Sequence, residues 1–138
     1  MTAHFEATVL AEPAAISGLT DRIMKHLDAD GVDPRAVHDV ALAVEEILTN
    51  LGTHGNCANI LATARLFVCP TMVKVEIVDA GPTFDPRETP DPALGGGAGQ
   101  RQIGGLGLFL VRNLVSTIDY VRTDETNYTS FAVPRHSA

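Results

Sequence analysis

The sequence predicts an α+β fold, a two-layer α/β sandwich in which about three helices cover one face of a mixed, mostly antiparallel sheet. The 138 residues, 45% of them apolar, are enough for one domain with its own core. The expected elements follow the order β-α-α-β-β-loop-α-β-β. Because strands follow one another directly, without strict alternation of strand and helix, a doubly wound parallel sheet is disfavoured. We expect residues 1–138 to form a single domain.

The chain begins with a strand and a helix. Residues 4–11 alternate loosely between apolar and polar side chains, which predicts a strand. Pro13 starts a segment with apolar residues at helical spacing up to about Leu27, and residues 28–31 end it. The side chains expected to face the core are those of Ile16, Leu19, Ile23, Met24 and Leu27.

A longer helix follows. Asp33 and Pro34 form the pattern of an N-cap followed by proline at the first helical position. We expect this helix to end near His54 and Gly55. One apolar stripe runs along it, formed by Val37, Val40, Ala41, Val44, Ile47, Leu48 and Leu51.

The middle of the chain predicts a hairpin. Residues 60–68 and 72–78 read as two strands with a tight connection at Pro70–Thr71. In the second strand, apolar residues alternate with Lys74 and Glu76, so one face of that strand should be exposed to water.

A long loop follows the hairpin. Residues 80–103 are rich in proline and glycine, and an irregular segment of this length inside a compact domain is usually functional or disordered. We expect its portion from about 86 to 103 to be a flexible lid that orders over a ligand.

The last third predicts a helix and a second hairpin. The helix is expected over residues 105–118, and two short strands over about 118–123 and 128–134, joined by a polar turn at 124–127. The inward side chains of the helix should be those of Leu106, Phe109, Leu110, Val111, Leu114 and Val115.

Charge and hydropathy exclude several classes of protein. The formal net charge of −7 disfavours a general nucleic-acid binder, which is normally basic. The N-terminus lacks the pattern of a signal peptide, and no run of about 18 apolar residues could span a membrane. We therefore expect a cytoplasmic protein that contacts neither nucleic acid nor membrane directly. A local basic patch stays open, formed by Arg101, Arg112, Arg122 and Arg135.

The two cysteines, Cys57 and Cys69, are too few for a disulfide-stapled secreted scaffold. Two reduced, buried thiols of a cytosolic protein are expected instead. His54-x-x-Cys57 has the spacing of half a zinc site, but no second close pair exists to complete it.

The first candidate site motif lies on the long helix. Glu46, Asn50 and His54 are spaced by four residues and so project from one side, whereas Glu45 is rotated by about 100°. An amide oxygen of Asn50 is a hard ligand that suits Mg²⁺, and Glu46 could orient or deprotonate an attacking hydroxyl. The alternative is a solvated polar face, because the row lies roughly opposite the apolar stripe. Asn is a poor mid-helix residue, which weakens that alternative.

The second candidate motif follows the strand that ends near residue 78. Asp79 could accept the exocyclic amine of adenine, and Gly81 would let the base approach the backbone closely. The alternative is an ordinary Asp-x-Gly turn, which is common. Phe84 and Asp85 leave the same choice open, since the Phe could simply belong to the core.

The third candidate motif, Gly104-Gly105-Leu106-Gly107, opens the third helix. Free N–H groups and the positive dipole end at that point would favour phosphate. A P-loop would require Gly-Lys-Ser/Thr, which is missing, and a Rossmann fingerprint would follow a strand directly instead of a long loop.

Together, the three motifs resemble the N, G1 and G2 boxes of the GHKL (Bergerat-fold) ATPases, the group of DNA gyrase B and sensor histidine kinases. The chain carries E-x-x-x-N-x-x-x-H-G, then D-x-G-x-x-F-D-P, then G-G-x-G-L-x-L, in the family order. The match is closer to the small bacterial anti-sigma factor serine/threonine kinases with a histidine kinase-like ATPase domain. The resemblance extends from the first strand to the last hairpin.

The resemblance implies roles for individual residues. Glu46 matches the catalytic base, Asn50 the Mg²⁺-binding Asn, and Asp79 with Gly81 the adenine-reading pair. The other matched positions are His54 and Gly55 at the pocket edge, Gly104, Gly105, Leu106 and Gly107 over the phosphates, Thr129 at the adenine, and Arg101 near the γ-phosphate.

The resemblance also implies a function. A stand-alone module of this size, without the helices of a sensor kinase or the transducer domain of a gyrase, resembles the partner-switching regulators. Such a protein binds an alternative sigma factor, uses ATP and Mg²⁺ to phosphorylate a STAS-domain anti-anti-sigma protein on Ser or Thr, and forms a homodimer. One alternative is a nucleotide-binding regulatory module that sequesters a partner without kinase activity. Another is a domain that has lost ligand binding.

Overall fold

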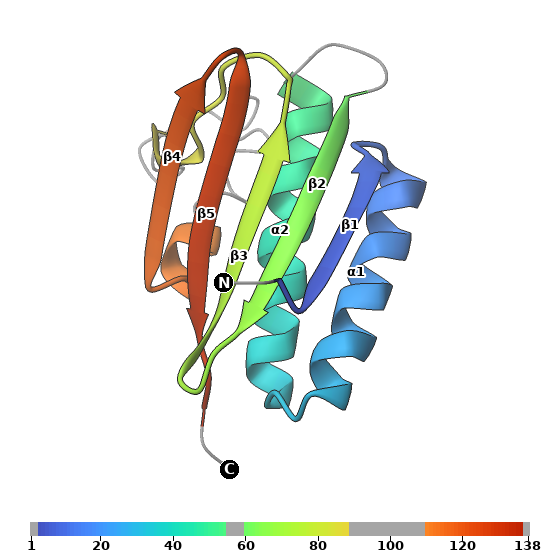
Figure 1. Ribbon diagram of the computed structural model, residues 1–138, viewed down its shortest axis with the longest axis vertical. Helices are drawn as coiled ribbons and strands as arrows, with labels where there is room; N and C mark the ends of the chain where they lie inside the picture. The colour runs from blue at the N-terminus through green and yellow to red at the C-terminus, as the bar shows by residue number, and fades with distance from the viewer. Residues whose placement is uncertain (1–2, 55–59, 89–109, 137–138) are drawn as a thin grey trace, which may run out of the picture.

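The computed structural model describes residues 3–54, 60–88 and 110–136 and forms two layers, with the helices on one face of a sheet (Figure 1). The helices are α1 (Pro13–Ala29), α2 (Pro34–His54), the short 3₁₀ turn η1 (Pro86–Glu88) and a helical segment at 110–114. The strands are β1 (Phe5–Leu10), β2 (Leu61–Val68), β3 (Met72–Asp79), β4 (Thr117–Thr123) and β5 (Thr126–Pro134).

The described strands form one sheet in the order β1-β2-β3-β5-β4, and every neighbouring pair is antiparallel. This confirms the predicted α+β sandwich, with a sheet more uniformly antiparallel than the mixed one expected. The register places Asp79 of β3 opposite Asn127 of β5, and Ile77 opposite Thr129. The end of β3 therefore meets the start of β5, although the two lie far apart in the sequence.

Local signals at the helix ends behave as predicted. Asp33 caps α2, since its Oδ2 accepts a hydrogen bond from the Ala36 N–H at 3.1 Å. At the C-terminal end of α1, Gly31 has a φ of 78°, and the Val32 N–H donates a hydrogen bond to the Leu27 carbonyl oxygen at 3.0 Å. That pattern is a Schellman motif, in which a left-handed glycine stops α1 and lets the chain turn into α2.

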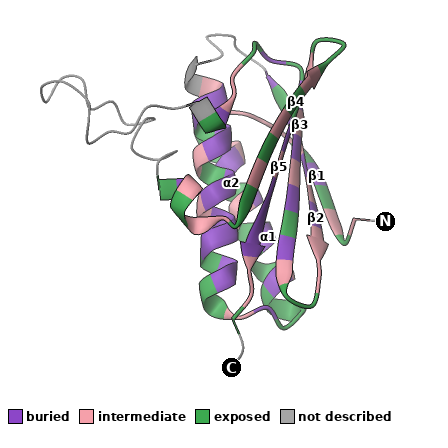
Figure 2. Cartoon of the chain, turned by 90° about the vertical axis from the view of Figure 1, so that its left-hand side faces the viewer, coloured by how far each residue is buried: buried purple, intermediate pink, exposed green. Residues whose placement is uncertain are grey.

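The core lies between the helix layer and the sheet, where buried residues gather in Figure 2. All seven residues of the stripe predicted on α2 are buried, and so are four of the five predicted on α1. Met24 is the exception on α1 at 40% exposed, and Leu110, expected to point inward, is 46% exposed. The wet face predicted for β3 is confirmed, because Lys74 is exposed and Glu76 is half-buried.

Two boundaries near the C-terminus differ from the sequence prediction. The helix expected to reach residue 118 ends at 114, because Thr117 already pairs with Ala132 of β5. The polar turn shrinks to Asp124 and Glu125, whose φ angles of 50° and 60° give the twist that a two-residue hairpin favours. Asn127 therefore belongs to β5 and not to a turn.

The described residues also bear on the cysteines, on metal binding and on membrane spans. Cys69 is a free thiol that is half-buried, not buried as expected, and Cys57 lies outside the described residues. Within the described residues, no three or more His, Cys, Asp or Glu side chains gather in a group that could hold a metal ion. None of the helices in the described part of the chain combines the length and apolar character of a membrane span.

We expect Gly52→Ala to destabilise the fold. A Cβ atom at this position in α2 would lie 2.4 Å from the backbone carbonyl oxygen of Ala11, which leads into α1. Because a backbone atom cannot move aside as a side chain can, relieving the clash requires a shift of the helix, which costs about 1–3 kcal/mol. Denaturant unfolding measures the change.

Gly18→Ala is the matched control. Gly18 lies in α1, and an added Cβ would meet nothing within 4 Å. This change should stabilise the protein by about 0.5–1 kcal/mol, the usual gain from Gly to Ala in a helix. Equal effects of the two substitutions would contradict a steric role for Gly52.

Candidate functional site

Asn50 is buried near the C-terminal end of α2. Its side chain is 1% exposed, and its Nδ2 donates to the Glu46 carbonyl oxygen at 2.7 Å. Ala43, two helical turns earlier on the same side, is also fully buried. The interpretation of this row as a solvated face opposite the apolar stripe is therefore wrong for Asn50, because the stripe of α2 is wide enough to include it.

The Oδ1 atom of Asn50 has no hydrogen-bond partner among the described residues, although it is buried. A buried polar atom without a partner costs roughly 1–3 kcal/mol, so native proteins rarely retain one without a reason. An amide oxygen in this state fits a hard cation such as Mg²⁺, which binds through oxygen atoms. This single oxygen of Asn50 thus fits the metal that the motif predicts.

Glu46 lies one turn before Asn50 and is half-buried. Burial, and next the negative charge of neighbouring Glu45, raise the pKa of the Glu46 carboxyl above its ordinary value. A carboxylate with a raised pKa is a stronger base than an exposed one, which suits proton transfer. His54 ends α2, but its side chain and all of Gly55 lie outside the described part.

Asp79 ends β3, and its carboxyl is almost completely buried. The Oδ1 atom accepts two hydrogen bonds, from the Gly81 N–H at 2.8 Å and from Asn127 Nδ2 at 2.9 Å. The first bond is the local Asp-x-Gly turn that the sequence left open as an alternative. The second comes from β5, so this aspartate is held by more than a local turn.

Gly81 is closely surrounded by neighbouring side chains. A Cβ atom here would lie 3.0 Å from Asp79 Oδ1 and 3.1 Å from Leu51 Cδ1. Leu51 is the residue after Asn50 on α2, so this contact joins the helix that carries Asn50 to the segment that carries Asp79. The structure thereby brings the first two predicted motifs to the same end of the domain.

Thr129 and Asn127 lie on the helix-facing side of β5, and both are buried. Thr129 is two residues beyond the cross-strand partner of Asp79, which makes it a diagonal neighbour of the aspartate. Sequence reasoning missed Asn127 because it assigned this residue to a turn. With the strand starting at Thr126, alternation would have placed Asn127 on the buried face together with Thr129, Phe131 and Val133.

Comparison with known proteins identifies the family. The model of a family described as "Histidine kinase-like ATPase domain" matches residues 9–132. The chain belongs to the histidine kinase-like ATPase family. The GHKL resemblance is thus confirmed, and the family implies ATP binding and a GHKL kinase or regulator. A search of curated proteins found no match.

Two solved structures resemble this histidine kinase-like ATPase. One contains the RsbU and RsbW domains of Rv1364c from Mycobacterium tuberculosis, with 17% identity and a TM-score of 0.65 over 97% of this chain and 33% of that one. This chain therefore spans about a third of that structure, and at such identity the likeness shows the fold. The other is the mycobacterial sensor histidine kinase MprB, with 17% identity and a TM-score of 0.49 over 97% of this chain and 100% of that one.

The segment after Gly81 makes one contact with the core and one ion pair within itself. Phe84 packs against the hydrophobic core, as the simpler interpretation of this residue proposed. The Arg87 guanidinium contacts the Asp85 carboxylate at 2.6 Å and lowers the pKa of that carboxyl. The rest of the predicted lid, residues 89–103 with Arg101, lies outside the described residues, as do Gly104, Gly105, Leu106 and Gly107.

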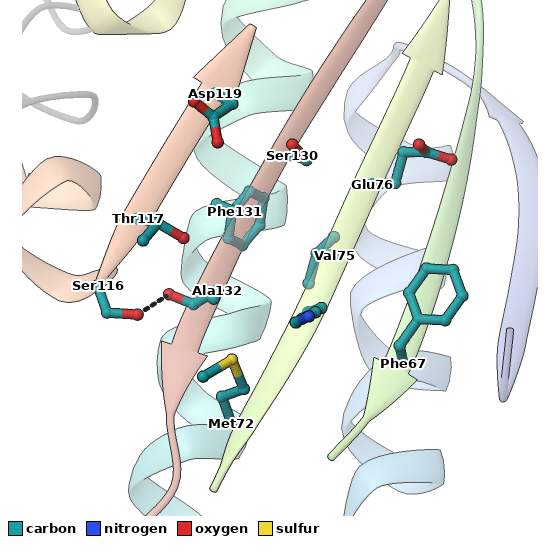
Figure 3. Close-up of a pocket in the computed structure, with 11 residues that line it drawn as sticks. Phe67, Met72, Val75, Glu76, Ser116, Thr117, Asp119, Ser130, Phe131 and Ala132 are labelled. Carbon is teal, nitrogen blue, oxygen red and sulfur yellow. Dashed lines mark hydrogen bonds between the residues drawn. The ribbon is translucent and has the colours of Figure 1, made fainter. Parts of the chain in front are cut away.

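The outer face of the sheet carries a hollow of about 430 Å³ (Figure 3). Lys74 and Glu76 contribute to it, and they alternate along β3 with the core residues Val75 and Ile77. The hollow is therefore on the opposite face of the sheet from Asp79. None of the described residues predicted to bind nucleotide lines it. Its other lining residues include Phe67, Met72, Ser116, Thr117, Asp119 and Ser130.

We expect Glu46→Gln to raise the melting temperature at neutral pH. Because burial raises the pKa of Glu46, charging this carboxyl costs more free energy in the folded protein than in the unfolded chain. The contribution of Glu46 to stability is complete below its unfolded pKa and is lost as pH rises through the higher folded pKa. Gln is neutral at every pH, so its advantage should appear near pH 7 and vanish below about pH 4. Thermal unfolding followed by circular dichroism at both pH values measures it.

Glu45→Gln is the control for this experiment. Glu45 is exposed and raises the pKa of Glu46 only through charge repulsion, the smaller of the two causes. Its substitution should therefore give a smaller gain at neutral pH than Glu46→Gln. A Glu46→Gln protein that melts at the wild-type temperature near pH 7 would contradict a burial cost at this position.

Proposed function

We propose that this protein is an ATP- and Mg²⁺-dependent protein serine/threonine kinase and anti-sigma factor in a partner-switching circuit. The observation that carries the proposal is the buried amide of Asn50, whose Oδ1 lacks a partner among the described residues. That amide lies beside Leu51, which contacts the position of Gly81. An oxygen suited to Mg²⁺ and a carboxylate suited to adenine therefore lie at one end of the domain.

In this proposal the nucleotide binds between α2 and the end of β3. The Asp79 carboxylate accepts the exocyclic amine of adenine, the backbone of Gly81 lies beside the base, and Thr129 joins the adenine contact from β5. His54 and Gly55 contribute to the pocket edge. The segment Gly104 to Gly107 covers the phosphates with backbone N–H groups, and Arg101 supplies positive charge near the γ-phosphate.

Phosphoryl transfer then depends on Asn50 and Glu46. Asn50 would hold Mg²⁺ through its amide oxygen, and the bound metal would supply positive charge that offsets the charge on the phosphates. Glu46 accepts the proton of the attacking serine or threonine hydroxyl, a role that its raised pKa supports. The residues on α2 thereby orient the nucleophile and remove its proton, while the glycine segment provides electrostatic stabilisation.

The partners in this proposal are a STAS-domain anti-anti-sigma protein as phosphate acceptor, an alternative sigma factor as the bound target, and a second copy of this chain. The assignment rests on the resemblance of the three motifs to the partner-switching kinases. The shared fold with a chain that includes an RsbW domain agrees with it.

Asn50→Ala should weaken ATP binding only when Mg²⁺ is present. Removing the amide oxygen deletes a metal ligand, so the affinity for ATP with Mg²⁺ should fall by about tenfold or more. The affinity measured in EDTA should change little. Titration calorimetry with and without Mg²⁺ measures both.

Two variants sharpen this test. Asn50→Asp keeps a hard oxygen ligand and should retain the Mg²⁺ dependence, whereas Thr49→Ala changes an exposed neighbour on α2 and should behave like wild type. An equal loss of affinity in both buffers for Asn50→Ala would show that Asn50 acts on the fold and not on the metal.

Glu46→Gln should abolish most phosphoryl transfer while ATP still binds. Loss of a general base typically lowers a rate by about 10²–10⁴-fold. Transfer of radiolabel from γ-labelled ATP to a purified STAS-domain protein measures the rate. A wild-type rate in this variant would reject the assigned base. Tight ATP binding by the wild type without transfer to any STAS-domain protein would favour the alternative, a regulatory module that sequesters its partner.

A further inference from the structure

We propose that Asn127 is a positioning residue that sets the base specificity of the nucleotide site, by holding Asp79 so that one carboxylate oxygen faces the 6-position of the purine. The inference rests on the proposed nucleotide site. It adds a residue from β5, supported by two residues of the edge strand β4, to the residues that the sequence motifs predict.

The side chain of Asn127 is 2% exposed, and its amide nitrogen contacts three acceptors. Nδ2 lies 2.9 Å from Asp79 Oδ1, 3.0 Å from the Pro82 carbonyl oxygen and 3.2 Å from the Gly81 carbonyl oxygen. The amide group therefore ties the carboxylate to the backbone of the turn that follows it. This turn is the segment that would lie beside the base.

The amide oxygen of Asn127 accepts from β4. Arg122 Nη1 donates to it at 2.8 Å, and the Tyr120 hydroxyl donates to it as well. The same Arg122 nitrogen also donates to the Gly81 carbonyl oxygen at 2.9 Å. Two strands and the turn are therefore joined through one asparagine.

These partners fix the orientation of the Asn127 amide. A flipped amide would turn its oxygen toward the Asp79 carboxylate and two carbonyls, none of which can donate a hydrogen bond. Its nitrogen would then face the Arg122 guanidinium, which has no acceptor. Because only one orientation satisfies every group, Asn127 presents a rigid donor to Asp79.

A fixed donor limits how the Asp79 carboxylate can turn. All of the hydrogen bonds that Asp79 makes through its side chain to described residues involve Oδ1, from the Gly81 N–H and from Asn127. The second oxygen is left to accept from a ligand. Adenine offers an amine donor at its 6-position, whereas a 6-oxopurine offers an oxygen that a carboxylate repels. A carboxylate able to rotate could instead accept the N1–H of the 6-oxopurine.

The experiment compares the dissociation constants of ATP and inosine triphosphate, whose bases differ at the 6-position. The wild type should prefer ATP. The ratio of interest is the dissociation constant of inosine triphosphate divided by that of ATP. In Asn127→Ala, this ratio should fall by about tenfold, because one hydrogen bond to a charged group is lost and the carboxylate can turn. In Tyr120→Phe, which removes only the hydroxyl that supports the amide, the ratio should fall by about two- to threefold.

Ser130→Ala is the matched control, because this serine lies on the same strand but lines the outer hollow. Its ratio should equal that of the wild type. If Asn127 served only stability, both nucleotides would weaken together and the ratio would stay constant, which would overturn the proposal. Should Asn127→Ala fail to fold by circular dichroism, the ratio of Tyr120→Phe decides. A folded wild type that binds neither nucleotide would instead reject the proposed function itself.

Discussion

The contact between the C-terminal end of α2 and the end of β3 is the constraint on which the candidate site depends. The buried stripe of α2 holds the helix against the sheet, and two glycines let it approach closely. Gly52 faces the carbonyl of Ala11, and Gly81 leaves space for Leu51. Because larger side chains at these positions would separate the layers, the distance between Asn50 and Asp79 is determined by packing and not by either motif alone.

Buried polar residues mark this end of the domain. Among the described residues, five polar or charged residues are buried, and four of them are Asn50, Asp79, Asn127 and Thr129. Burying such groups costs free energy unless each finds a partner, so a cluster of them is rarely explained by stability alone. Asp79 and Asn127 are hydrogen-bonded to each other, whereas Asn50 Oδ1 has no hydrogen-bond partner among the described residues. This difference agrees with the proposed roles, in which Asp79 and Asn127 contribute to base recognition and Asn50 binds a cation.

Family and fold answer different questions about this protein. The family match over residues 9–132 is a statement about sequence pattern and carries the expectation of ATP binding. The likeness to a solved structure at 17% identity is a statement about fold, and one fold can support many activities. The chemistry therefore has to be argued from individual residues, such as the half-buried carboxyl of Glu46 and the hydrogen-bonded amide of Asn127.

The sequence by itself determined the elements whose signals are local. Asp33 with Pro34 began α2, Gly31 ended α1, and the spacing of apolar residues located the core face of both helices. The spacing of Glu46 and Asn50, and the Asp-x-Gly turn at Asp79, were also visible, because each depends on a few neighbouring residues. Only the tertiary structure decided that Asn50 is buried and that Asn127 faces Asp79. The physical reason is that burial depends on what packs beside a helix, and strand pairing joins residues that are distant in sequence, so neither is encoded in a short stretch of chain.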